Sequence, residues 1–155
     1  MKTAMRLAAT FATVWSLTTY AGYALAHSDA PHPDTLEATQ GGQLGVAGAF
    51  NYELVIDKKA KDGVESSVIV YITDHAGKKI QTTGASGTAT ILAGKLKASA
   101  ILTPDGANRM KGVAKYAATP DMKVLVSITL AGNPPEQTRF TPLAIAKDGH
   151  TDHQH

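Results

Sequence analysis

Short runs in which every second residue is apolar are the feature that most constrains the fold of this chain. A two-residue period is typical of a strand that buries one of its faces. No stretch of useful length shows the 3.6-residue period of an amphipathic helix. The clearest runs cover residues 50–56, 67–72, 96–102 and 123–130.

Weaker runs predict further strands, and the segments between runs are rich in turn-forming residues. The weaker strands are expected at 43–47, 87–92, 109–116 and 136–140. Seven or eight short strands, with turn signals about every dozen residues, are typical of a β-sandwich. We therefore predict an all-β domain over residues 41–145, a single antiparallel β-sandwich that is immunoglobulin-like in its broad architecture only. The cysteine and tryptophan marks of antibody domains are missing from it.

The first 26 residues have the composition of an export signal. Lys2 and Arg6 precede a mostly apolar stretch over 7–20, and Ala24-Leu25-Ala26 supplies the small residues of a peptidase site. The stretch is shorter than the roughly 20 residues that a bilayer-spanning helix needs, so an uncleaved anchor is the weaker alternative. We expect a signal peptide over 1–26 and a periplasmic protein that is not inserted in the membrane.

Charge and cysteine content exclude several classes of function. Removal of residues 1–26 takes away only Lys2 and Arg6, which leaves 13 acidic and 13 basic side chains. A neutral domain without an arginine cluster does not predict binding to nucleic acid or anionic lipid. The sequence has no cysteine nucleophile, no Gly-x-Ser-x-Gly motif and no phosphate-binding glycine loop. We expect that the protein is not an enzyme.

Five of the six histidines lie near the two ends of the sequence, in polar segments. Residues 27–40 and 146–155 contain too few apolar side chains to build a core, so we predict two flexible arms. Imidazole nitrogens are suited to copper, zinc and nickel. The expected ligand is therefore a divalent transition metal, with copper favoured and zinc or nickel as alternatives.

The amino-terminal arm offers a chelating group that depends on where the signal is cut. After cleavage at Ala26, the free amine and the ring of His27 can chelate one copper ion, and His32 can complete the plane. The amine has a pKa of about 7.7–8.0, so a metal displaces its proton easily. After cleavage at Ala24, His27 would be the third residue, where an amine, two backbone amides and an imidazole surround copper or nickel. The alternative is that these histidines occur by chance.

The carboxyl-terminal arm holds the densest group of candidate ligands. In an extended segment, residues two apart point the same way at a spacing of roughly 6.6 Å. His153 and His155 can therefore converge on one ion, with Asp152 or His150 as a third ligand. Ordering a loose segment costs about 1–2 kcal/mol per residue, so we predict weak and rapidly exchanging capture. A histidine-rich tail that serves only solubility is the alternative.

His75 is the one histidine in the predicted body. The segment Asp74-His75-Ala76-Gly77-Lys78 predicts a hairpin turn in which Gly77 adopts the left-handed conformation. A histidine at such a tip is usually solvated. Glu53 and Asp74 are its nearest candidate partners if it binds a metal.

Several segments carry a resemblance to a known group of proteins. They are 41–43, 50–55, 70–78, 84–89, 102–104 and 139–142, of which Tyr-x-Thr-Asp-His-x-Gly-Lys over 71–78 is the most specific. Together they resemble small periplasmic β-sandwich proteins of heavy-metal resistance loci, and similar modules at the front of some metal-efflux adaptor subunits. The resemblance covers about residues 40–143.

This resemblance implies metal homeostasis, a ligand role for His75 with Glu53 as its partner, and an efflux-pump adaptor as a partner protein. In that family a histidine often precedes the double glycine, whereas this chain has Gln40 there. The departure removes the basis for a site built on that histidine.

The sequence as a whole predicts a periplasmic protein that sequesters or hands on a divalent metal in heavy-metal resistance or efflux. A metal-independent module that binds another envelope protein is the alternative. The candidate metal ligands are His27, His32, Glu53, His75, His150, Asp152, His153 and His155.

Overall fold

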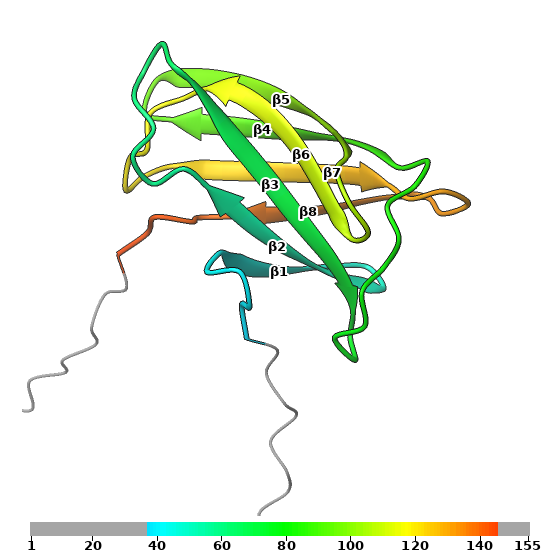
Figure 1. The fold of residues 1–155 in the computed structure, drawn as a ribbon. Helices are drawn as coiled ribbons and strands as arrows, with labels where there is room; N and C mark the ends of the chain where they lie inside the picture. The colour runs from blue at the N-terminus through cyan, green and yellow to red at the C-terminus, as the bar shows by residue number, and fades with distance from the viewer. Residues whose placement is uncertain (1–36, 146–155) are drawn as a thin grey trace, which may run out of the picture. The chain divides into compact units, whose positions relative to one another are not determined.

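The computed structural model describes residues 37–145, which form an all-β body of eight antiparallel strands (Figure 1). Each of the eight predicted runs coincides with one strand. In the described part of the chain, no helix is long and apolar enough to cross a membrane. The strands are β1 (Gln43–Ala47), β2 (Phe50–Ile56), β3 (Glu65–Asp74), β4 (Ser86–Ala93), β5 (Leu96–Pro104), β6 (Arg109–Lys115), β7 (Lys123–Thr129) and β8 (Pro135–Phe140).

Neighbouring strands are hydrogen-bonded in the order β1-β2-β3-β6-β5-β4-β7-β8, and the resulting sheet is nearly closed. The link between β5 and β6 is short, with only two residue pairs in register, Thr103↔Lys111 and Pro104↔Met110. The two edge strands, β1 and β8, lie beside each other. The side chain of Gln43 joins them, because its Oε1 accepts a hydrogen bond of 2.8 Å from the amide of Thr141.

The alternation of the sequence builds the core, as the apolar members of each run face inward. Tyr52, Leu54, Val70 and Ile72 are fully buried, and every second residue of β7 (Val124, Val126 and Ile128) is buried in the same way. The run over 96–102 departs from this pattern, because Leu96 is 47% exposed. Leu96 pairs with Ala93 at the tip of the β4–β5 hairpin, so it projects beyond the core.

Two polar residues of β2 are also buried, although alternation predicts that they face solvent. Asn51 and Glu53 are each almost inaccessible. The amide of Asn51 donates to the carbonyl oxygen of Asp74 at 3.1 Å, and the backbone before β1 covers Glu53. Local polar contacts therefore satisfy these two groups within the body.

The buried side chain of Tyr52 is expected to make the body less stable at alkaline pH. Its hydroxyl is buried without a hydrogen-bond partner among the described residues. Burial, together with the charge of Glu136, raises the pKa of Tyr52 to about 12 from 10.0. The unfolded chain therefore releases this proton at a lower pH than the folded chain does.

We expect the contribution of Tyr52 to the free energy of unfolding to be constant below pH 10. It should then fall by about 2–3 kcal/mol as the pH rises to about 12. Urea unfolding at several alkaline pH values measures this loss. Tyr52→Phe should remove it and change stability at pH 7 by no more than about 1 kcal/mol, since the hydroxyl has no hydrogen-bond partner within residues 37–145. An equal alkaline loss in Tyr52→Phe would contradict the assignment.

Candidate functional site

The structure describes two of the eight predicted metal ligands, Glu53 on β2 and His75 in the turn after β3. The other six lie outside the described residues: His27, His32, His150, Asp152, His153 and His155.

The carboxylate of Glu53 holds the backbone that leads into β1. Its Oε1 accepts hydrogen bonds from the amides of Gln40 at 2.7 Å and Gly42 at 3.0 Å. Its Oε2 accepts from the amide of Thr39 at 3.0 Å and from the hydroxyl of Thr39 at 3.4 Å. Glu53 is only 5% exposed. Thr39 and Gln40, which the sequence assigned to the amino-terminal arm, are thus fixed to β2, and the carboxylate is occupied by backbone donors.

His75 lies in the tight turn that the sequence predicts. Gly77 has a φ of 77°, which confirms its left-handed conformation, and Oδ1 of Asp74 accepts hydrogen bonds from the amides of Ala76 and Lys78. The ring of His75 is exposed, and its Nε2 lies 3.2 Å from the carbonyl oxygen of Gly48. In the tautomer that donates to Gly48, Nδ1 carries the lone pair that a metal ion would need.

The structure does not bring Glu53 and His75 together. Glu53 pairs with Tyr71, and His75 follows four residues later, which corresponds to about 13 Å along an extended strand. Over residues 37–145, no three His, Asp or Glu side chains are grouped closely enough to hold a metal ion. A complete ligand set that uses His75 would therefore need donors from other parts of the chain.

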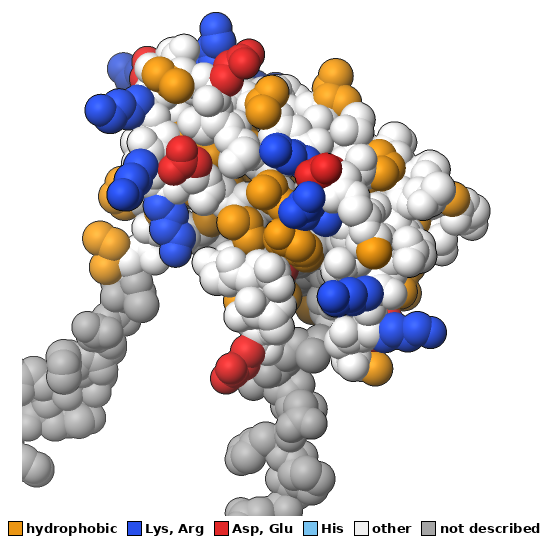
Figure 2. All heavy atoms as spheres, in the orientation of Figure 1, with side chains coloured by type: hydrophobic (Ala, Val, Ile, Leu, Met, Phe, Trp, Pro, Cys, Tyr) orange, Lys and Arg blue, Asp and Glu red, His pale blue; other side chains and the backbone are white. Residues whose placement is uncertain are grey.

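A groove of about 590 Å³ lies between the segment before β1 and the outer face of β3 and β6. Tyr71 and Arg109 line it as register partners on adjacent strands. Nη2 of Arg109 forms a 2.9 Å ion pair with Asp105. A hydrogen bond with Tyr71 and the charge of Asp105 raise the pKa of this guanidinium. Figure 2 shows apolar side chains gathered over β2 and β3 on this face, with charged side chains around them.

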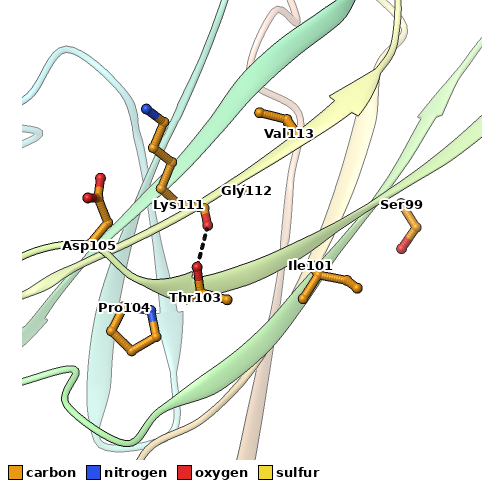
Figure 3. Close-up of a pocket in the computed structure, with 8 residues that line it drawn as sticks. All are labelled: Ser99, Ile101, Thr103, Pro104, Asp105, Lys111, Gly112 and Val113. Carbon is orange, nitrogen blue, oxygen red and sulfur yellow. Dashed lines mark hydrogen bonds between the residues drawn. The ribbon is translucent and has the colours of Figure 1, made fainter.

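A second groove, of about 580 Å³, lies where β5 and β6 diverge (Figure 3). Ile101 is 75% exposed and Val113 is 52% exposed in this groove. The hydroxyl of Thr103 donates to the carbonyl oxygen of Lys111 at 3.5 Å, at the end where the two strands are still paired. The groove therefore presents two large aliphatic side chains to solvent.

A third groove, of about 420 Å³, has an apolar floor and basic walls. It lies on the outer face of β4, β5, β7 and β8, with Leu92 and Leu125 on the floor and Lys97, Lys123 and Arg139 around them. We call it the basic groove. The sequence alone does not reveal this groove, because its residues become neighbours only through the strand order β5-β4-β7-β8.

No family model matches this chain, and the search of curated proteins found no match.

Proposed function

We propose that this chain is a periplasmic metal-binding protein that sequesters or hands on a divalent metal, with copper favoured over zinc and nickel. The metal is its cargo, and the protein acts by binding rather than by catalysis. Residues 27–32 and 150–155 supply most of the ligands. An adaptor subunit of a metal-efflux pump is the partner that we propose to receive the ion.

The placement of the histidines carries this proposal. Five of six lie outside residues 37–145, in segments that also contain acidic residues. The core of the body is built without any histidine, so these side chains are not needed for folding. His75 is the exception in position, yet it is exposed and only its Nε2 lies near a carbonyl oxygen, that of Gly48. Exposed imidazoles of this kind bind and release transition metals readily.

We further propose that the body is an immunoglobulin-like sandwich. One half would comprise β1-β2-β3-β6 and the other β5-β4-β7-β8. The short ladder between β5 and β6 supports this division, since the two halves share only a small number of backbone pairs there.

Titration of residues 27–155 with cupric and zinc ions tests the proposed function. We expect saturable binding that disappears below about pH 6, because imidazoles with a pKa near 6.5 become protonated and can no longer coordinate. Replacement of His150, His153 and His155 by alanine should remove part of the stoichiometry, whereas Lys79→Ala serves as a control on an exposed side chain. Absence of saturable uptake at micromolar metal would reject the proposal.

The groove between β5 and β6 favours a second candidate function, a module that binds an envelope protein without metal. Exposed aliphatic side chains in a groove are typical of protein interaction sites. A photo-crosslinking residue at Ile101 should then yield a defined adduct in cells, while the same residue at exposed Val46 should not. Equal labelling from both positions would contradict this second function.

A further inference from the structure

The outer face of β5, β4, β7 and β8 carries no acidic side chain. Glu136 is the one acidic residue in these four strands, and it pairs with buried Ile128, so it lies on the inner face. The outward residues form rows across the strands: Lys97–Leu92–Lys123, Ser99–Thr90–Leu125–Arg139, Ile101–Thr88–Ser127–Gln137 and Ser86–Thr129–Pro135. The three cations of this face all lie in the basic groove.

Cations on the outer face of β3 and β6, by contrast, have acidic neighbours. Arg109 forms an ion pair with Asp105, and Lys115 is the register partner of Glu65. Within residues 37–145, no salt bridge involves a cation of the basic groove. Asp121 lies two residues before Lys123, and three cations still exceed this one anion. The basic groove is therefore suited to an anionic ligand.

An exposed leucine lies between two of these cations. Leu92 pairs with Lys97 on one side and with Lys123 on the other. The Cα atoms of the two lysines therefore lie about 10 Å apart, across two strand spacings. Leu92 is 46% exposed, and Leu125 adds to the apolar floor beneath the same groove. A ligand that fits this row needs an apolar group between two anions.

An extended protein segment supplies that arrangement. Its side chains alternate, so in the pattern acid-x-aliphatic-x-acid all three named side chains point the same way. The two acids are then about 13 Å apart and can reach Lys97 and Lys123, while the aliphatic side chain lies over Leu92. Other polyanions fit less well. The rows above contain no aromatic side chain on which nucleic-acid bases could stack, and anionic membranes are generally bound by clusters of about 4–8 basic residues.

We propose that the basic groove binds an extended segment of another protein with the pattern acid-x-aliphatic-x-acid. The carboxylates pair with Lys97 and Lys123, and the aliphatic side chain covers Leu92. Arg139 lies in the adjacent row and favours a further acidic residue in the partner. This interaction goes beyond the proposed function and needs no metal ion, since no candidate metal ligand lines the groove.

A peptide titration of residues 27–155, in buffer that contains a chelator, tests the proposal. The probe is acetylated and amidated Ser-Glu-Ser-Leu-Ser-Glu-Ser, and binding is followed by amide chemical shifts. We expect saturable shifts that are largest at Leu92, Lys97 and Lys123 and that disappear at high salt, which screens exposed charges. The matched control Ser-Ser-Glu-Leu-Glu-Ser-Ser has the same composition but places its acids opposite the leucine, so it should bind several times more weakly. Equal binding of the two peptides, or no saturable shifts in the groove, would overturn the proposal.

Variants of exposed lysines locate the site. Lys97→Ala and Lys123→Ala should leave the body folded, and each should weaken binding of the probe by roughly two- to fivefold, the range for loss of an exposed ion pair. Lys59→Ala is the matched control, because it removes an exposed lysine next to Lys58, and it should bind as the parent does. An equal loss in Lys59→Ala would show attraction to charge alone and would reject the groove. Binding of phosphatidylglycerol vesicles by the parent but not by Lys123→Ala would assign the groove to lipid and reject a protein partner. Failure of the metal titration would leave these results unaffected.

Discussion

Replacement of Glu53 by alanine is expected to lower the free energy of unfolding by about 3–5 kcal/mol. The carboxylate accepts four hydrogen bonds from Thr39, Gln40 and Gly42 in a nearly inaccessible position. Its removal leaves backbone donors without their partner and a space where the side chain packed. Urea unfolding measures the loss, as a lower midpoint with an unchanged slope.

Two comparisons separate this structural role from metal ligation. Glu65→Ala, at an exposed position at the start of β3, should change stability by less than about 0.5 kcal/mol. Glu53→Gln keeps one acceptor oxygen, so its loss should be intermediate. Neither Glu53 variant should alter metal stoichiometry while the body stays folded. A Glu53→Gln protein that is fully stable but no longer binds metal would contradict the structural role.

Replacement of Gly112 by valine is expected to cost about 3 kcal/mol, because β5 passes directly over this residue. A Cβ atom on Gly112 would overlap the carbonyl oxygen of Ile101 and lie 3.2 Å from the Cβ of Ala100. Backbone atoms cannot rotate away as a side chain does, so the strands must separate. β5 and β6 are joined by only two residue pairs in register, so few backbone hydrogen bonds remain to hold these strands together. Thermal and urea unfolding both measure this loss.

Gly94→Ala is the matched control for the glycine. Gly94 has a φ of 57° and no atom within 4 Å of an added Cβ, so its cost comes from backbone conformation alone. That cost is about 1–2 kcal/mol. If Gly112→Val were no more destabilising than Gly94→Ala, the close approach of β5 to β6 would not limit stability.

The sequence was sufficient for the parts of the fold that depend on local pattern. The alternation in residues 50–56 identified both the strand β2 and the inward position of Tyr52 and Leu54. The Asp74-x-x-Gly77 spacing identified the turn, because a left-handed residue and an aspartate cap act over only a few residues.

Contacts between segments that are far apart in the sequence could not be predicted from the sequence. Alternation placed Glu53 toward solvent, and nothing in the run reveals that the backbone of Thr39 and Gln40 covers it. The basic groove needs Leu92 between Lys97 and Lys123, which the pairing of β4 with both β5 and β7 creates. The ligand pairing of His75 with Glu53, which the resemblance implied, is likewise a matter of register, and the register separates them.

The contact between β1 and β8 has a consequence for how this body behaves at high concentration. Exposed edge strands serve as templates on which other molecules add strands and grow into fibrils. Here Gly45 lies against Phe140, and Gln43 binds the backbone just past β8, so each edge is shielded by the other. Loosening this junction, for example with Gln43→Ala, should expose both edges and promote edge-to-edge association between molecules.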